Sequence, residues 1–342
     1  HDPGLFIKAV AKGGSDPRHS LVIGASVHDI VGAMGAGCLT IAVASGKHTI
    51  EQLSGLKPNL VVRSVTMLLH GTHISAHLAN GTTVYRIGIV GSDNSHAIAF
   101  SQIANDPNNP NHVPGFEATH LFGLDQGRNE EVAQLGKIKN IVSDSQEMVG
   151  EVDVAFVEFR HGGLHLEYAR PFIESGTPVF VDKPLAANAA DARKLIQLAE
   201  EKNALMTSFS TLIFTNMVQE FKGLFKAHEP VFLSVSGPAD PGSEYGGLIF
   251  YAIHVAEMFN EVAGHGIREV VAVAKGSNVI STLVHDRFLG SIRTSPQIEG
   301  FATEGEAGRA YVARKLGDEP YYRNGMAKIK EMLDGKRWPL TA

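Results

Sequence analysis

The stretch with the clearest chemical potential is Val-Phe-Val-Asp-Lys-Pro-Leu, residues 179–185, in which Lys183 directly follows a buried strand-like run. A lysine in this place, held by the following Pro184, is aimed at the carboxyl edge of a parallel sheet, where cofactors bind. Its ammonium group can hold a hydroxyl group and stabilise charge that develops on oxygen. The alternative interpretation is a surface lysine at the end of a strand.

A glycine turn earlier in the chain indicates a second chemical feature. Arg86–Val90 reads as an apolar strand, Gly91 begins a tight turn, and Ala97–Ala104 reads as a helix. A helix N-terminus after such a turn presents free N–H groups and a positive dipole end to a pyrophosphate. The full pattern has glycines two and five residues later, where this chain has Asp93 and His96, so an ordinary turn remains the alternative. We expect the cofactor to be contacted by Gly91, Ser92, Asp93, Asn94, Ser95 and His96.

Asp125 follows the second predicted strand, Phe116–Phe122. A carboxylate in this place can accept hydrogen bonds from the adenosine ribose and repel a 2′-phosphate, which favours NAD over NADP. It lies 34 residues after Gly91, more than the usual ~20. The turn-rich insertion 105–115 accounts for the excess. A turn aspartate before Gly127 is the alternative interpretation.

The elements around these residues predict two kinds of sheet. Strand-like and helix-like segments alternate over residues 84–210, as in an α/β fold with a parallel, doubly wound sheet. From about Leu212 the strands are joined by short connections, which indicates an open, mainly antiparallel sheet in an α+β domain. We expect one helix there, roughly Phe250 to Val262. The strands expected in this domain are Val231–Ser236, Val270–Ala274, Ile280–Val284, Gly290–Thr294 and Gln297–Ala302.

Residues 84–330 resemble the glucose–fructose oxidoreductase / inositol dehydrogenase / MocA (Gfo/Idh/MocA) family of NAD(P)-dependent oxidoreductases. The resemblance rests on Arg-Ile-Gly-Ile-Val-Gly, Glu-Val-Asp-Val-Ala-Phe-Val, Leu-His-Leu-Glu-Tyr-Ala, Glu-Ser-Gly-Thr-Pro-Val-Phe-Val-Asp-Lys-Pro-Leu-Ala and Tyr-Gly-Gly-Leu-Ile-Phe-Tyr-Ala-Ile-His. It implies an enzyme that transfers hydride between NAD and a sugar- or polyol-like substrate.

The same resemblance implies roles for individual residues. Lys183 corresponds to the lysine of the family's Glu-Lys-Pro motif, with Asp182 in place of the glutamate. His254 corresponds to the catalytic histidine, so Lys183 would polarise the substrate oxygen and His254 would move the proton. His165 matches a histidine that faces the nicotinamide pocket. Residues expected to contact the cofactor, besides the turn, are Asp125, Glu158, His165, Asp182, Lys183 and Pro184.

The chain departs from this family at Phe250. The family usually has an aspartate there, four residues before its histidine, and the carboxylate raises the basicity of the imidazole. A nucleotide-binding protein with impaired catalysis is therefore the alternative function. His161, His96 and Tyr251 are further candidates for the same pocket.

Residues 1–75 resemble the C-terminal part of haloacid-dehalogenase-type (HAD) phosphatases. The matching words are Leu-Val-Ile-Gly-Ala-Ser-Val-His-Asp, Ala-Gly-Cys-Leu-Thr-Ile-Ala-Val and Pro-Asn-Leu-Val-Val. Ala25 stands where that family has a first acidic residue, and Asp29 alone remains. A lone carboxylate is a poor Mg²⁺ site, so we expect no catalysis by this segment; a phosphatase fragment is the alternative. The predicted order is this segment, a linker at 76–83, the dinucleotide-binding domain at 84–210 and the α+β domain at 211–342.

Composition narrows the partners and the cellular location that the protein could have. The 342 residues carry a net charge of −6 without a basic block, which argues against nucleic-acid partners. No apolar run reaches the ~18 residues of a membrane span. The single Cys38 fits a reducing compartment, and we expect a cytoplasmic protein.

His161 and His165 have no nearby carboxylate–histidine pair to complete a set of metal ligands, so we expect no metal site. A homo-oligomer through the C-terminal sheet is implied by the resemblance. The start at His1, without Met, indicates a processed product or a fragment.

Overall fold

The computed structural model describes residues 2–62 and 84–335. The chain divides into two compact units, His1–Val84 and Tyr85–Ala342. The linker predicted at 76–83 lies outside the described residues.

The first unit contains a three-stranded parallel sheet in the order β1-β2-β3. Ile30, Ala42 and Leu53 are fully buried in its small core. Helix α2 begins after Ser26, whose side chain and that of Asp29 form a capping box that satisfies free N–H groups of the first turn. The elements are α1 (Pro3–Lys12), η1 (Pro17–His19), β1 (Leu21–Gly24), α2 (Val27–Gly35), β2 (Leu39–Val43), α3 (Ile50–Ser54) and β3 (Leu60–Val62).

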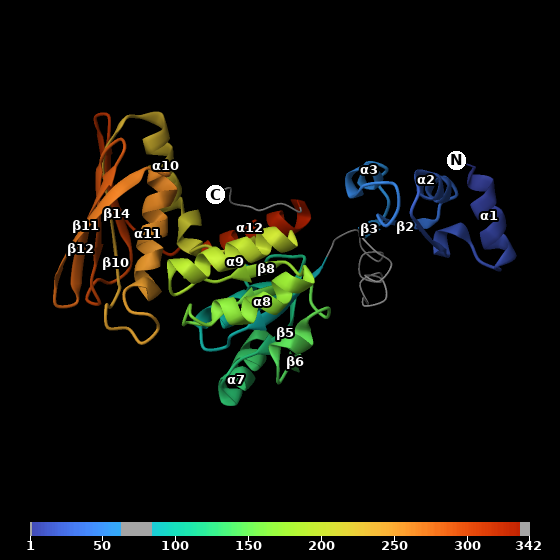
Figure 1. Ribbon diagram of the computed structural model, residues 1–342, viewed down its shortest axis with the longest axis horizontal. Coiled ribbons are helices and arrows are strands. Elements are labelled where there is room, and N and C mark those ends of the chain that lie inside the picture. The colour runs from blue at the N-terminus through green and yellow to red at the C-terminus, as the bar shows by residue number, and fades with distance from the viewer. Residues whose placement is uncertain (1, 63–83, 336–342) are drawn as a thin grey trace. The chain divides into compact units, whose positions relative to one another are not determined.

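The second unit begins with a six-stranded, wholly parallel sheet in the order β6-β5-β4-β7-β8-β9 (Figure 1). This is the doubly wound dinucleotide-binding order, and the direction of winding reverses between β4 and β7. The elements are β4 (Tyr85–Val90), α6 (Ser95–Asn105), β5 (Phe116–Phe122), α7 (Gln126–Gly136), β6 (Asn140–Ile141), η2 (Ser145–Met148), β7 (Val154–Val157), α8 (His165–Ser175), β8 (Val179–Val181), α9 (Ala189–Lys202) and β9 (Met206–Thr207).

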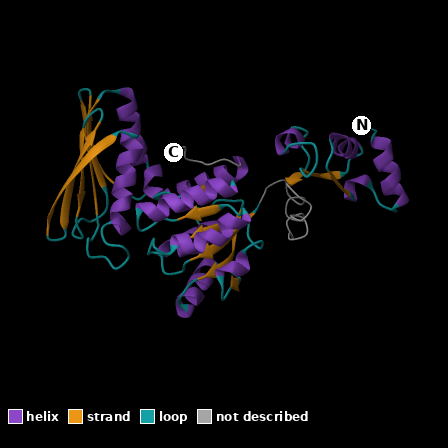
Figure 2. Cartoon of the chain, viewed as in Figure 1, coloured by secondary structure: helices purple, strands orange, loops and turns teal. Residues whose placement is uncertain are grey.

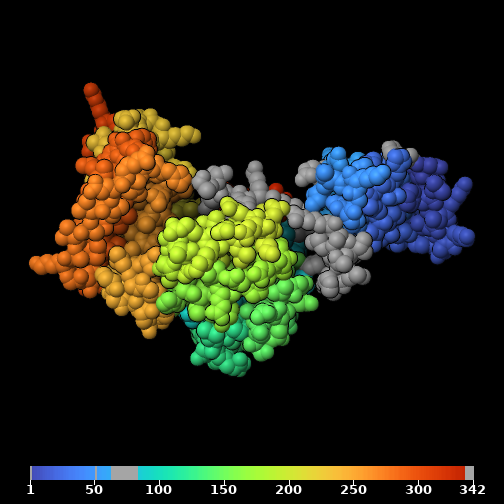
Figure 3. Space-filling model, viewed as in Figure 1, coloured from blue at the N-terminus to red at the C-terminus, as the bar shows by residue number. Residues whose placement is uncertain are grey.

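Helices cover both faces of this sheet. Phe100 of α6 and Val132 of α7 pack in the core of one face, and the C-terminal helix α12 (Tyr321–Gly335) adds Met326 and Ile329 to that core. This helix falls within the α+β domain expected at 211–342, yet it packs on the dinucleotide-binding domain. Phe172 of α8 and Leu195 of α9 fill the core of the other face. The space-filling view shows α8 and α9 closing over that face (Figure 3).

A six-stranded mixed sheet follows, in the order β11-β12-β13-β10-β14-β15. Only the β10–β13 pair is parallel. Helices α10 and α11 pack on one face, and among the described residues no helix lies on the other (Figure 2). The elements are η3 (Thr211–Phe214), α10 (Asn216–Ala227), β10 (Pro230–Gly237), α11 (Ile249–Ala263), β11 (Ile267–Lys275), β12 (Asn278–His285), β13 (Leu289–Thr294), β14 (Ala302–Ala307) and β15 (Ala310–Lys315).

The α/β and α+β fold class predicted from the sequence is confirmed, with two corrections in the second sheet. The strand expected at Gln297–Ala302 begins only at Ala302, and β15 was missed, because these strands are rich in charged residues and alanine. Helix α10 was also missed, although Val218, Phe221 and Phe225 recur at helical spacing and are buried. Among the described residues, no helix is long and apolar enough to span a membrane.

Candidate active site

Gly91 lets the loops after β4 and β7 approach each other at the crevice where the winding reverses. Its φ of +113° is in the region that favours glycine, and a Cβ atom there would lie 2.6 Å from the backbone N of Phe159. Asn94 then caps helix α6 by accepting a hydrogen bond from the N–H of His96 at 3.2 Å. The helix begins at Ser95, two residues earlier than the sequence predicted. Its positive end therefore faces the crevice, as a pyrophosphate site requires.

The side chains of this turn fasten it to the ends of β7 and β8. Both carboxylate oxygens of Asp93 accept from the backbone N–H of Arg160, each at 3.3 Å. Asn94 Nδ2 donates to Asp182 Oδ2 at 3.0 Å, and His96 Nδ1 lies 2.8 Å from the same oxygen. Burial opposes the charge of Asp182, but the nearby His96 and Lys183 lower its pKa below the ordinary value. Asp182 is therefore an anion that orders the turn.

Glu158 lies fully buried directly after β7. Neither of its carboxyl oxygens has a hydrogen-bond partner among the residues that the structure describes. Burial, with the negative Asp182 and Asp93 nearby, raises its pKa well above the ordinary value. Burial thus favours the protonated form of Glu158, which can donate a hydrogen bond to a ligand oxygen.

His165 does not offer a free nitrogen to the crevice. It is fully buried, with Nδ1 2.8 Å from the carbonyl oxygen of Pro184 and Nε2 2.8 Å from that of Phe159. His165 therefore contacts the backbone on both sides of its ring and helps to position Pro184, the residue after Lys183. His161, the second-rank candidate, accepts from the N–H of Gly163 at 3.0 Å through Nδ1.

Lys183 stands immediately beyond β8 and is 3% exposed. Its Nζ lies 5.2 Å from the ring centre of Phe250 and 5.6 Å from that of Tyr251, so the ammonium rests against two aromatic faces. Both rings belong to the first turn of α11. The motif that contains Lys183 therefore contacts α11, the helix that contains His254.

His254 is buried one helical turn after Phe250, and its ring lies 5.1 Å from that of Tyr251. Its Nδ1 is 2.7 Å from Ser210 Oγ. Burial lowers the pKa of His254 well below the ordinary value, and the positive Lys183 adds to this effect. His254 is therefore a neutral imidazole.

Two residues of this site were missed from the sequence, Ser210 and Glu257. The backbone N–H of Ser210 donates to Glu257 Oε2 at 2.5 Å. Burial raises the pKa of Glu257 to about 7. The available signal was that Glu257 follows His254 by three residues on one helix, and that Ser210 follows a strand of the parallel sheet.

Asp125 follows β5, as predicted, and caps helix α7. Its Oδ1 accepts from the N–H of Arg128 at 2.7 Å, and no described residue bonds to Oδ2. Arg128 reaches back to the glycine turn, where its Nε donates to the carbonyl oxygen of Ser92 at 2.9 Å. Asp125 is exposed beside that turn, in the place where a ribose would lie.

These residues fit a dinucleotide. The Gly91 turn leaves room for close approach, and the start of α6 supplies N–H groups. Glu158 has two buried carboxyl oxygens without a described partner, and Asp125 has a free oxygen. The second unit would hold the pyrophosphate at residues 91–96 and the ribose at Asp125.

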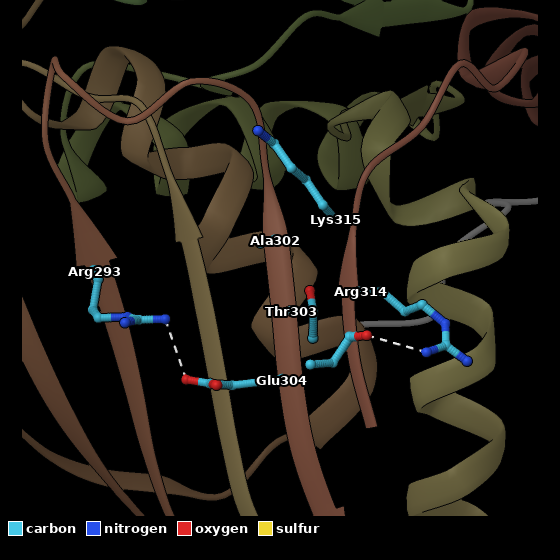
Figure 4. Close-up of a pocket in the computed structure, with 7 residues that line it drawn as sticks. Arg293, Ala302, Thr303, Glu304, Arg314 and Lys315 are labelled. Atoms are coloured by element: carbon cyan, nitrogen blue, oxygen red, sulfur yellow. Dashed lines mark hydrogen bonds and ion pairs between the residues drawn. The ribbon is translucent and has the colours of Figure 1, made fainter. Parts of the chain in front are cut away.

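The other candidate features do not join this site. Asp29 is engaged in capping α2, where it accepts from Ser26 Oγ at 2.7 Å. No group of three His, Cys, Asp or Glu residues in the described parts of the chain is arranged to hold a metal. A cavity of about 280 Å³ lies on the second sheet, and neither Lys183 nor His254 lines it (Figure 4). Its lining includes Arg293, Thr303, Glu304, Arg314 and Lys315.

Comparison with known proteins agrees with this geometry. Residues 85–209 match the model of an oxidoreductase family with an NAD-binding Rossmann fold, and residues 1–68 match a HAD-hydrolase-like model. Both resemblances predicted from the sequence are thereby confirmed.

Individual relatives are distant. An uncharacterized oxidoreductase, YhhX, of Escherichia coli is 23% identical over 54% of this chain and 57% of its own length. An inositol 2-dehydrogenase of Gluconacetobacter diazotrophicus is 26% identical over 43% of this chain and 37% of its own. The matches thus span about half or less of these relatives. The structure of GenD2 from gentamicin A biosynthesis, in complex with NAD, superposes with a TM-score of 0.65 at 15% identity, over 76% of this chain and 89% of that one.

Proposed function

Because residues 85–209 carry an NAD-binding Rossmann domain of an oxidoreductase family, we propose that the Tyr85–Ala342 unit is an NAD-dependent dehydrogenase. Its substrate is a sugar- or polyol-like molecule, which it oxidises at a CH–OH group or reduces at the corresponding keto group. The inositol 2-dehydrogenase among the relatives supports this substrate class.

The observation that carries the proposal is the meeting of Lys183 and His254 around Tyr251, beside the turn that begins at Gly91. When bound, the nicotinamide ring supplies hydride chemistry at the substrate carbon. Lys183 and His254 contact the oxygen on that carbon and compensate its change of charge. The buried surroundings exclude water, which strengthens both interactions.

The choice of NAD over NADP is part of the proposal. The exposed carboxylate of Asp125 would face the 2′-position of the ribose, where a phosphate would meet a like charge. The guanidinium of Arg128 does not compensate the charge of a 2′-phosphate, because its Nη1 is already paired with Glu131 at 2.6 Å.

We also propose that two copies associate through the uncovered face of the second sheet. Strand alternation and register place several exposed apolar side chains on that face. These side chains are Val271 (51% exposed), Val273 (70%), Ile280 (54%), Leu289 (55%) and Tyr311 (64%). Light scattering should give at least twice the chain mass, and Ile280→Glu should lower it; a monomeric parent protein would contradict this part.

Titration of the protein's fluorescence with NADH, followed by a screen of polyols and their keto forms for NAD-linked turnover, tests the dehydrogenase. Saturable binding with turnover of one class supports it. The second candidate function, a nucleotide-binding protein without catalysis, is favoured by Phe250 in place of a carboxylate and predicts binding without turnover. Absence of NADH binding would contradict both.

A further inference from the structure

The hydrogen bonds of Ser210 determine which nitrogen of His254 carries a proton. Ser210 is fully buried, and its Oγ accepts from the backbone N–H of Leu212 at 3.3 Å. Within the described residues, the only acceptor for the Ser210 hydroxyl proton is His254 Nδ1, at 2.7 Å. A hydroxyl has one proton to donate, so Ser210 donates and Nδ1 accepts.

A neutral imidazole carries one proton on its two ring nitrogens. Because Nδ1 of His254 accepts a hydrogen bond, that proton is on Nε2. The ring is kept neutral by its burial and by the positive charge of Lys183, with His96 acting in the same direction and Asp182 against it; together they lower the pKa of His254. No described residue hydrogen-bonds to Nε2. The Nε2–H group is therefore a donor without a partner, beside Tyr251 and Lys183.

Glu257 holds Ser210 in the position that this arrangement needs. Its Oε2 accepts from the backbone N–H of Ser210 at 2.5 Å, and it lies three residues after His254 on α11. Helix α11 thus contacts the loop after β9 through two side chains. The carboxylate of Glu257 binds the backbone N–H of Ser210, and the imidazole of His254 binds the Ser210 hydroxyl.

We propose that Ser210, positioned by Glu257, fixes His254 as the Nε2–H tautomer, so that His254 donates a hydrogen bond to the reacting oxygen and keeps its proton. This inference rests on the proposed function and changes the role expected for His254 from the sequence. In carbonyl reduction, the carbon would take the hydride with its electron pair from bound NADH, and the electrons of the C=O π bond would move to the oxygen. The oxygen takes one proton from Lys183 Nζ, which becomes a neutral amine. Oxidation is the reverse, with the hydroxyl proton passing to the amine.

The tautomer can be read directly by ¹⁵N NMR of the full chain labelled at histidine, because protonated and unprotonated ring nitrogens differ widely in chemical shift. Subtraction of the His254→Gln spectrum identifies the His254 signals. We expect a neutral ring with the proton on Nε2 at neutral pH. A proton on Nδ1, or an imidazolium, would overturn the proposal even if NADH binds and turnover occurs.

Two serine variants separate the specific contact from general packing. Ser210→Ala should convert His254 to a mixture of tautomers. Ser234→Ala is the matched control, because Ser234 is 1% exposed and its Oγ has no partner among the described residues; it should leave the His254 spectrum unchanged. An unaltered tautomer in folded Ser210→Ala would also overturn the proposal. The spectra require no cofactor, so an absence of NADH binding would refute the proposed function without deciding the tautomer.

Kinetics give a second, independent test on the substrate that the screen identifies. The glutamine amide of His254→Gln can donate a hydrogen bond but cannot exchange a proton near neutral pH. As a donor variant it should retain at least tenfold more kcat than His254→Ala, with the shape of the parental pH profile. If His254→Gln is as inactive as His254→Ala, the role of His254 is proton transfer and the inference is wrong.

Discussion

Lys183 Nζ lies 5.2 Å above the ring of Phe250, the residue that stands where the family resemblance leads one to expect an aspartate. The ammonium is thus stabilised by an aromatic face and not by a carboxylate. Phe250→Asp would put a negative charge in this site, which makes proton loss from neighbouring groups less favourable. The profile of oxidation rate against pH should therefore move to higher pH. Phe250→Leu, which removes the ring without adding charge, is the control; an unmoved profile in Phe250→Asp would show that residue 250 does not act on Lys183.

The cofactor preference depends on Asp125. Asp125→Asn keeps an oxygen to cap α7 at the N–H of Arg128 but removes the negative charge. We expect the ratio of NADPH to NADH affinity to rise about tenfold, because like-charge repulsion is relieved. Dissociation constants for both cofactors at one ionic strength measure this. Equal affinities in the parent protein would show that Asp125 does not select NAD.

Glu257 should make stability depend on pH. Burial raises its pKa from 4.5 to about 7 in the folded protein. A raised folded pKa gives stability that is fully present below the unfolded value of 4.5 and is lost as pH rises through about 7. Glu257→Gln should remove this loss. The difference in free energy of unfolding between the variant and the parent should therefore rise by up to about 3 kcal/mol between pH 4.5 and pH 8.

Denaturant unfolding across this pH range, in the parent and in Glu257→Gln, measures the difference. Glu261→Gln is the matched control, because Glu261 lies one turn further along α11 and pairs with Lys222 at 2.6 Å. It should leave the parental slope in place. Identical slopes in the parent and Glu257→Gln would mean that Glu257 ionises normally.

Local sequence patterns were sufficient for the first sheet of the second unit and for Lys183. Buried parallel strands are short apolar runs, and residues that follow them meet at one edge, so the amino-acid sequence alone places Gly91 and Lys183 together. Ser210 could not be found this way. Its contact with His254 joins residues 44 apart and depends on how α11 docks against the loop after β9. Likewise the sequence of β14 shows no apolar alternation, because its buried positions hold the small or polar residues Thr303, Gly305 and Ala307.

The N-terminal unit should be without phosphatase activity. Ala25 replaces an expected acidic residue, and Asp29 is committed to the capping box of α2. A protein that starts near Gly81 should fold and bind NADH as the full chain does, because the compact unit begins at Tyr85. Mg²⁺-dependent hydrolysis of p-nitrophenyl phosphate by the full chain, above a metal-free control and absent from the shortened protein, would contradict this.

Lys183 acts on the substrate oxygen in the proposed NAD-dependent reaction, so the decisive measurement is kcat of Lys183→Ala. We expect no measurable turnover of the substrate found in the screen. The NADH affinity should stay within a few-fold of the parent, because the Gly91 turn and Asp125 are untouched. His254→Ala, which loses one hydrogen-bond donor, should fall about 10²–10³-fold and remain measurable. A near-parental kcat in Lys183→Ala would show that Lys183 does not act on the substrate oxygen.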